Sequence, residues 1–334
     1  MFLLSNFFFI IKPLFRSSNC IDSNKEVGSS SFGINQIANV SDCLFVRSQV
    51  FIGDGGVICL KDNNLYSIVV KRSTFYNCQV DSVNLHYGGA ICVWCNNAES
   101  QLYMICASDC RAKAVHFADL YTSKSKNNTV EYLSVTRCSN AEQGFFSTVL
   151  GYGYTKYDYS NSSLNNADFG SGFRFAETSS FTSHHCSFSH NKDAKGPSIL
   201  GTKSLGSFEQ CNIVHNTCLI TGIISTENNG EIAFQNCVFH NNHGTLFNST
   251  QGSISVSGSS VYHIDYLSWG SITLSNNNNG FTSTFMIEFY SSNHCYANAN
   301  YLEKNPQTIL RVTKILPTAF VFSLIQLNSF IYLL

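Results

Sequence analysis

A six-residue block recurs three times between residues 181 and 248. It reads Cys186-Ser-Phe-Ser-His-Asn191, then Cys211-Asn-Ile-Val-His-Asn216, then Cys237-Val-Phe-His-Asn-Asn242. The leading cysteines lie 25 and then 26 residues apart (186 to 211, 211 to 237), and a glycine-led apolar run follows each block. Periods of about 20–50 residues are typical of repeat proteins in which each unit packs on the next. The spacing therefore predicts a stacked repeat array.

The block also predicts the shape of each unit. Alternate residues of a strand share one face, so the cysteine and the apolar residue two positions later point the same way. The closing asparagine tolerates the left-handed backbone of a tight corner. Abundant Phe and Tyr with Gly, Asn and Ser punctuation favour strands and turns over helices. We expect an all-β fold, a right-handed parallel β-helix, with an all-β sandwich as the alternative.

The same core position can be traced through the other units. We place it at Phe45, Phe75, Cys110, Cys138 and Val261. The 50 residues from Cys138 to Phe188 then span two units, one of them degenerate. Segments 121–129 and 150–170 fit the period poorly and are expected to loop out, and such insertions often form the binding surface of a solenoid. The candidate contact loop, for which a plain loop is the alternative, consists of Tyr152, Tyr154, Tyr157 and Tyr159.

Both ends of the chain are apolar. Residues 1–18 have the length of a secretory signal, with a buried first strand or helix as the alternative, and residues 19–40 are a lead-in or cap. Residues 309–334 include twenty uncharged residues, enough to cross a hydrocarbon core of about 30 Å. We expect this segment to attach the protein to a membrane, as a span or as a lipid-anchor signal. The alternative is an apolar cap on the repeat domain, residues 41–300.

Charge and sequons bear on partners and location. With 20 Lys+Arg against 21 Asp+Glu, the chain has no basic footprint for nucleic acid. Four N-x-S/T sequons are candidate glycosylation sites, at Asn39, Asn127, Asn161 and Asn248. Together with the apolar ends, they predict entry into the secretory pathway and attachment at the cell surface or membrane.

Fourteen cysteines suggest some disulfides if the chain is secreted. The candidate disulfide partners, with a zinc site as the weaker alternative, are Cys92, Cys95, Cys106 and Cys110. The cysteines expected to stack in the core as buried thiols are Cys43, Cys186, Cys211 and Cys237. His190, His215 and His240 recur beside the corner asparagines, where solvated corner residues are expected rather than a metal site.

Two glycine pairs extend the pattern toward a known family. Gly55-Gly-Val-Ile58 and Gly88-Gly-Ala-Ile91 match GGA(I/L/V), while Phe188-Ser-His-Asn191 and Phe239-His-Asn-Asn242 match FxxN. Over about residues 40–265 the chain resembles the polymorphic membrane protein repeats of surface proteins from intracellular bacteria and parasitic protists. The resemblance implies a right-handed β-helix displayed at the cell surface, often adhesin-like. Repeat core and corner positions are Gly55, Gly56, Gly88, Gly89, Phe188, Asn191, Ile213, Asn216, Phe239 and Asn242.

A non-catalytic role is the prediction. β-Helices of the pectin-lyase-like shape also house polysaccharide lyases and hydrolases, which need close acidic pairs, or a base beside a charge-neutralising group. Here acidic residues such as Asp109, Asp119 and Glu131 show no such pairing, so no catalytic residue, metal or cofactor is assigned. We expect adhesin-like contact with a glycan or protein of a host or neighbouring cell. The alternatives are a secreted structural or carbohydrate-binding solenoid, or a degenerate polysaccharide-active enzyme, which three converging charged side chains would favour.

Overall fold

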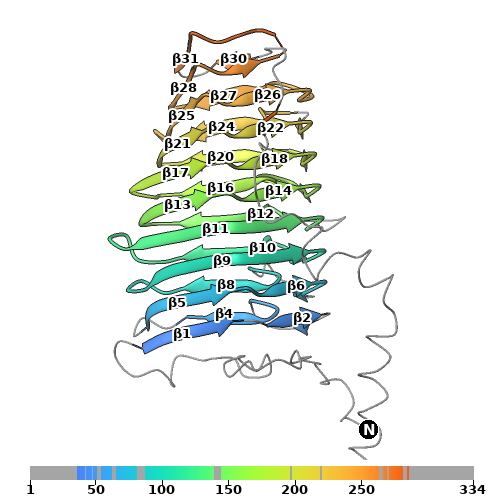
Figure 1. Ribbon diagram of the computed structural model, residues 1–334, viewed down its shortest axis with the longest axis vertical. Helices are drawn as coiled ribbons and strands as arrows, with labels where there is room; N and C mark the ends of the chain where they lie inside the picture. The colour runs from blue at the N-terminus through green and yellow to red at the C-terminus, as the bar shows by residue number, and fades with distance from the viewer. Residues whose placement is uncertain are drawn as a thin grey trace, which may run out of the picture.

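The fold is a parallel β-solenoid. The computed structural model describes residues 36–41, 43–46, 48–50, 54–61, 65–80, 87–138, 144–195, 198–218, 220–262, 266–268, 271–280 and 284–285. Throughout these ranges the regular elements are strands, stacked as the rungs of a β-helix (Figure 1). The predicted all-β fold is confirmed, and the sandwich is excluded because the strands pair in parallel rather than antiparallel.

The predicted terminal segments lie outside this description. They are residues 1–18, the lead-in up to residue 35, and residues 309–334. Among the described residues, the strands run from Gln36 to Ser275. In the part of the chain that the structure describes, no helix is long and apolar enough to cross a membrane.

Two large sheets and two small ones form the walls. The 17-stranded first sheet contains β1 (Gln36–Ser41), β2 (Leu44–Val46), β5 (Leu65–Lys71), β6 (Thr74–Tyr76), β9 (Glu99–Ser108), β11 (Asn127–Thr136), β13 (Tyr154–Asp158), β14 (Asn161–Ser163), β17 (Ser180–His184), β18 (Ser187–Ser189), β21 (Leu205–Glu209), β22 (Asn212–Val214), β25 (Glu231–Gln235), β26 (Val238–His240), β28 (Ser253–Ser257), β29 (Ser260–Val261) and β31 (Ser271–Ser275). The nine-stranded second sheet contains β4 (Ile58–Leu60), β8 (Ile91–Trp94), β10 (Val115–Tyr121), β12 (Phe146–Gly151), β16 (Phe173–Ala176), β20 (Ile199–Thr202), β24 (Ile224–Glu227), β27 (Phe247–Thr250) and β30 (Tyr266–Ser268). The small sheets contain β15 (Asn166–Ala167), β19 (Lys192–Asp193) and β23 (Thr217–Cys218), and β3 (Gln49–Val50) with β7 (Gln79–Val80).

One coil shows how the repeat is built. Strands β17, β18, β19 and β20 follow one another, and each pairs in parallel with the corresponding strand of the next coil. Left-handed residues turn the corners at His185 (φ 54°), His190 (φ 55°) and Lys203 (φ 48°). Backbone donors and acceptors that could not be satisfied within one coil are therefore satisfied by its neighbours.

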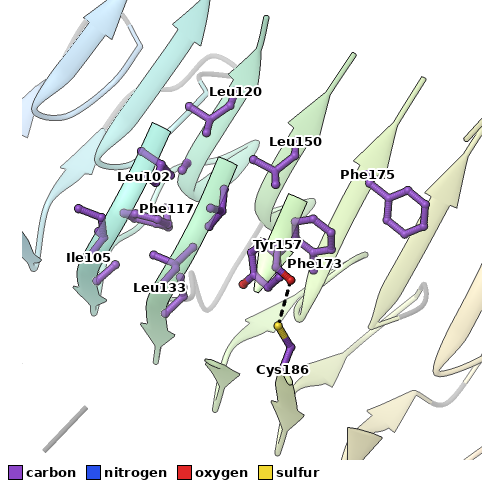
Figure 2. Close-up of a cluster of buried hydrophobic side chains, with 14 of the residues drawn as sticks. Leu102, Ile105, Phe117, Leu120, Leu133, Leu150, Tyr157, Phe173, Phe175 and Cys186 are labelled. Atoms are coloured by element: carbon purple, nitrogen blue, oxygen red, sulfur yellow. Dashed lines mark hydrogen bonds between the residues drawn. The ribbon is translucent and has the colours of Figure 1, made fainter. Parts of the chain in front are cut away.

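The interior is a continuous apolar column. Figure 2 shows side chains from successive coils pointing into it, including Leu102, Leu133, Tyr157 and Phe173. Phe175 stacks on Phe181 with ring centroids 4.5 Å apart, and such ring contacts add about 0.5–1.5 kcal/mol each beyond the burial of apolar area. A single coil has nothing to bury these side chains against, so stacking makes the core.

An asparagine ladder lines one inner corner. It consists of Asn165, Asn191, Asn216 and Asn242. The Oδ1 atom of each of the last three accepts the backbone N–H of the asparagine one coil before, at 3.0–3.1 Å. Asn216 Nδ2 donates to Phe188 O of the preceding coil at 2.9 Å, and the other three make the same bond. The asparagine of FxxN thus joins three successive coils.

Cysteines occupy the ladder position in earlier coils. Cys138 N donates to Asn165 Oδ1 at 2.8 Å, which continues the ladder into Cys138, Cys110 and Cys78. The expected core position was wrong here by three residues, because Ala107 and Val135 pair in register and fill the core instead. Burial raises the pKa of the Cys78 and Cys138 thiols, so both stay protonated.

A second thiol column lies at the preceding corner. Cys186, Cys211 and Cys237 are all buried, as expected for stacked core thiols, and each Sγ donates to a backbone oxygen of the preceding coil. Ser160 and Ser259 continue the column at its two ends. Cys43 differs from the expectation because it is disulfide-bonded.

Residues 150–170 do not form an inserted loop. They make a regular coil of β12, β13, β14 and β15, paired in register with the coils on both sides. Ser162 takes the core position between Val135 and Phe188, and its hydroxyl is satisfied by Gly172 O at 2.6 Å. A polar residue at the core position hid this coil from the sequence pattern. In segment 121–129, only residues 122–126 leave the strands.

The paired glycines sit where side chains cannot. Gly55 and Gly88 both have φ of 67°, in the left-handed region that glycine adopts without strain. A Cβ on Gly88 would lie 1.9 Å from Ile91 O, and one on its neighbour Gly89 would lie 2.1 Å from His116 O. The first glycine of the pair is therefore required by its own turn, and the second by close backbone approach to the next coil, as Gly56 also shows where it meets Gly89 O.

Replacing a ladder asparagine tests its role. Asn216→Ala removes the acceptor of Asn191 N–H and the donor to Phe188 O, both buried. Each buried group left unsatisfied costs about 1–3 kcal/mol, so the free energy of unfolding, measured in denaturant, should fall by about 2–6 kcal/mol. Asn127→Ala is the matched control because Asn127 is exposed in β11. Equal stability of the two variants would contradict the ladder's role.

Candidate functional site

A stack of half-buried rings crosses the outer face of the first sheet. Tyr103 contacts Tyr132 edge-on at 5.8 Å, Tyr132 stacks on Tyr159 at 5.2 Å, and Tyr159 stacks on His185 at 5.2 Å. The interplanar angles of the last two contacts are 11° and 5°. We call these four residues the ring stack. Most ring faces in the stack contact another ring. The stack therefore exposes mainly ring edges and tyrosine hydroxyl groups to solvent.

Three rings of the stack occupy left-handed corners. Tyr132, Tyr159 and His185 have φ of 56°, 49° and 54°. This backbone costs a non-glycine residue about 1–2 kcal/mol, less for Asn. The next coil places Gln210 at this corner, with φ of 51°, and the two after it place Asn236 and Gly258, which adopt this backbone more readily. Ring contacts offset the cost only in coils that keep an aromatic residue, so the stack is a local feature of these coils.

A row of charged side chains runs beside the ring stack. It consists of Glu131, Lys156, Asp158, His184 and Glu209, and we call it the charge row. Lys156 Nζ lies 2.8 Å from Glu131 Oε1 and 3.0 Å from Asp158 Oδ2. His184 Nδ1 lies 2.9 Å from Asp158 Oδ1, and its Nε2 lies 3.7 Å from Glu209 Oε2. Ionisable side chains from four coils therefore converge, and those of the first three coils lie within hydrogen-bonding reach of one another.

The charge row is largely paired within itself. Hydrogen bonds from Lys156 to Glu131 and Asp158 raise the pKa of its ammonium well above the usual range, so it stays charged. Asp158 also accepts His184 N–H at 3.0 Å and is only 5% exposed. His184 remains 35% exposed, with Nδ1 held by Asp158. This arrangement fixes an imidazole and a lysine in place and leaves Lys156, His184 and Glu209 for contact with a partner.

The repeat could have revealed both features. Glu131, Asp158, His184 and Glu209 align strand by strand, at spacings of 27, 26 and 25 residues. The residues that follow three of them are Tyr132, Tyr159 and His185. No paired-carboxylate or His-centred motif is visible in the sequence, because the residue type at this position changes from coil to coil. Polar residues of any type that recur at the coil period are the sequence signal that identifies the charge row and the ring stack.

The four tyrosines of the candidate contact loop do not lie together. Tyr157 is buried in the core, 4.8 Å from the ring of Phe173, and Tyr159 belongs to the ring stack. Tyr154 is 51% exposed at the start of β13, and Tyr152 lies at another corner under Lys124 Nζ, 5.0 Å away. The expected contact loop is absent because the segment is a regular coil, whose strand alternation sends these side chains to different faces.

A second cluster surrounds a buried carboxyl on the outer face of the second sheet. Trp94 Nε1 donates to Asp119 Oδ2 at 2.7 Å, and burial raises the pKa of Asp119 to about 7. Lys61 Nζ lies 4.7 Å from the Trp94 ring centroid and pairs with Asp54. Asp119 is 1% exposed, which closes the carboxyl to a ligand in this conformation.

The four candidate disulfide partners are not bonded to one another. Cys92, Cys95 and Cys110 carry thiols, whereas Cys106 is disulfide-bonded. The folding pattern explains this result. Cys92 points outward from β8, Cys95 Sγ donates to Leu60 O inside the core, and Cys110 belongs to the corner ladder. Within the described residues, no group of three or more His, Cys, Asp or Glu residues is arranged to hold a metal ion.

The sequon asparagines differ in exposure. Asn39 and Asn127 are exposed and Asn248 is partly exposed. Asn161 is only 5% exposed, and its Nδ2 donates to Ser163 Oγ at 3.0 Å. A glycan on Asn161 does not fit this conformation, because its side chain is buried and its Nδ2 is engaged by Ser163.

Histidines stack at the corner outside the asparagine ladder. His190 and His215 are exposed, with ring centroids 4.7 Å apart and an interplanar angle of 17°. His240 contacts His215 edge-on at 5.9 Å. Partial burial and the neighbouring His215 lower the pKa of His190. His190 therefore resists protonation in the folded protein.

Comparison with protein-family models, curated proteins and solved structures found no match for this chain.

Acid should weaken the fold through His190. Folding lowers the pKa of His190 below its unfolded value of about 6.5, so the folded protein binds protons less readily than the unfolded chain. The resulting stability is fully present above about pH 6.5 and is lost as the pH falls below that value. His190→Asn should reduce the fall in denaturant midpoint between pH 7 and pH 5, since asparagine accepts the left-handed corner. His243→Asn, at an exposed histidine, serves as control. Unchanged acid sensitivity of His190→Asn would refute the assignment.

Trp94 should report the titration of Asp119. Its fluorescence is expected to change with a midpoint near pH 7, in a Trp269→Phe background. Because folding raises this pKa, the carboxyl's contribution to stability is present below about pH 4 and lost as pH rises through 7. Asp119→Asn should abolish the transition, whereas Asp193→Asn, at another buried carboxyl with a pKa of about 7, should leave it. A transition that survives Asp119→Asn would overturn the assignment.

Proposed function

We propose that this protein is a non-catalytic contact protein of the cell surface, adhesin-like, which binds a partner through the ring stack and the charge row. One observation carries the proposal. Half-exposed rings and fixed charges lie side by side across neighbouring coils, on a regular and rigid face. Tyrosine is enriched in protein interfaces, and paired charges give such a surface its specificity.

A protein ligand fits this face better than a glycan. Sugar rings bind by lying on an open aromatic face, but Tyr159 has Tyr132 on one side and His185 on the other. Tyrosine hydroxyls, Lys156 and His184 offer hydrogen bonds and charge at the edge instead. We therefore rank a protein surface of a host or neighbouring cell first, and a glycan second.

The resemblance to polymorphic membrane protein repeats supports a place at the cell surface. Its GGA and FxxN positions coincide with the close backbone contact at Gly88 and with the asparagine ladder. Disulfides at Cys43 and Cys106 are in keeping with an oxidising compartment. The apolar segments 1–18 and 309–334 would bring the chain there and attach it to the membrane.

Paired corner substitutions test the contact surface. Tyr132→Asn with Tyr159→Asn removes two rings and leaves a residue that accepts the same backbone. Binding of fluorescent full-length protein to cultured animal cells and to a glycan array should fall at least about tenfold. Glu177→Asn with Lys203→Asn makes the same change at another corner and should leave binding intact. Retained binding by the tyrosine variant would show that the ring stack is not the binding site.

The location claim has its own test. Surface labelling of intact producing cells should reach the full-length protein, and labelling that appears only after lysis would overturn the cell-surface assignment.

The convergence of Glu131, Lys156, Asp158 and His184 favours a polysaccharide-active enzyme as the second candidate. His184, oriented through Nδ1 by Asp158, would be its general base. Against this, Lys156 is held between two carboxylates and is poorly placed to neutralise a sugar acid. Incubation of the full-length protein with acidic and neutral polysaccharides distinguishes an enzyme from a non-catalytic contact protein. New reducing ends or unsaturated products that vanish in His184→Ala would establish the enzyme.

A further inference from the structure

Two cysteines occupy the same place after the paired glycines. The sequences are Gly55-Gly-Val-Ile-Cys59 and Gly88-Gly-Ala-Ile-Cys92, so a cysteine follows each glycine pair at the same spacing. Strands β4 and β8 pair in parallel with Cys59 directly opposite Cys92. Adjacent strands lie about 4.8 Å apart, and a disulfide joins Cα atoms about 4.4–6.8 Å apart. The repeat therefore places the two cysteines at a distance that a disulfide can span.

Both cysteine side chains point away from the core. Cys59 lies in the middle of β4, and Cys92 is the second residue of β8. The strand neighbours of each cysteine fill the apolar column: Ile58, Leu60, Ile91 and Val93. Because successive residues of a strand point to opposite faces, the two cysteines share the outer face of the second sheet.

Exposure separates this pair from the other stacked thiols. Of the thiols in the described part of the chain, only that of Cys59 is not buried. The thiols of the core columns are buried and donate to backbone oxygens, as Cys110 does to Phe75 O and Cys186 does to Tyr157 O. Buried structural thiols are inert, whereas reactive thiols are partly exposed. Cys59 and Cys92 are therefore the stacked pair that an oxidant can reach.

The surroundings give the two thiols different roles. The adjacent Cys59 thiol and burial raise the pKa of Cys92, so Cys92 is the weaker nucleophile. Lys61 lies two residues after Cys59 on the same face, over the Trp94 ring, and its positive charge favours the Cys59 thiolate. Cys59 is thus the thiol that reacts first with an oxidant, and Cys92 is the one that completes the bond.

Strand β4 lies at the edge of the second sheet, next to β8 (Figure 1). Within the described residues, its partner in this sheet is β8 alone. An edge strand has hydrogen bonds on one side, so it opens more readily than the strands between two neighbours. A covalent bond from Cys59 to Cys92 would hold this strand in place.

We propose that Cys59 and Cys92 form a disulfide that fastens the first coil to the second. The Cys59 thiolate attacks a disulfide oxidant, such as glutathione disulfide, to form a mixed disulfide and release one oxidant thiol. The Cys92 thiolate then attacks Cys59 Sγ, which forms the Sγ–Sγ bond and releases the second oxidant thiol. The protein loses two protons and two electrons, and the oxidant gains both. This bond is independent of the contact surface proposed above.

Peptide mapping tests the disulfide. Full-length protein is equilibrated in a glutathione redox buffer, alkylated in denaturant without reduction and digested with chymotrypsin. Cleavage after Phe51, Leu60, Tyr87 and Trp94 places Cys59 and Cys92 in separate peptides, 52–60 and 88–94, that contain no other cysteine. Mass spectrometry should detect these two peptides joined, and reduction should separate them. Recovery of both as alkylated thiols, or of either joined to another cysteine, would overturn the proposal.

Hydrogen exchange tests what the bond does. Oxidation of the wild-type protein should slow exchange in β4 at least about tenfold, because the disulfide restricts opening of the edge strand. Cys59→Ser cannot form the bond and should show no slowing in the same buffer. Cys218→Ser keeps the pair and should respond as the wild type does, since Cys218 Sγ lies 3.5 Å from Thr221 Oγ1 and a hydroxyl suits this position. Equal slowing in Cys59→Ser would contradict the proposal, and if this variant does not fold, the wild-type peptide map still decides.

Discussion

Backbone hydrogen bonding between successive coils is the interaction on which this molecule depends. A coil contains short strands that never pair with one another, so nearly every ladder bond crosses to a neighbour, as in β17 with β21 or β18 with β22. The apolar column and the asparagine ladder only become possible once coils are stacked. Stability is therefore shared between neighbours, and no coil is a folding unit by itself.

At each corner, the residues that hold neighbouring coils together lie inside, and the residues exposed to solvent lie outside. Inside a corner, Asn191 and Asn216 bind the backbone of adjacent coils and leave no polar group free. On the outside, the left-handed residue that precedes each of these asparagines points away from the core. His190 and His215 occupy this position and stack on each other. A rigid interior thus allows exposed residues to recur at fixed distances. This regularity produced both the ring stack and the charge row.

Sequence periodicity predicted the fold class well because three blocks, from Cys186 to Asn242, repeat residue types at one spacing. It failed where chemistry changed but geometry did not. Ser162 stands in a core position and Cys110 in an asparagine position, and a pattern of residue types cannot equate them. The candidate site was missed for a related reason, since Asp158 and His184 share a column without sharing a charge. Only strand register relates such residues.

The asparagine ladder has a consequence for how the chain can change length. Each step from Asn165 to Asn242 uses the same bonds, and each coil meets its neighbours through the same strand pairs. Removing the 25 residues from Lys192 to Asn216 as a whole would present Asn191 with an equivalent partner in Asn242. Gain or loss of complete coils is thus the least disruptive form of variation for this architecture, whereas a shift of one residue breaks every ladder at once.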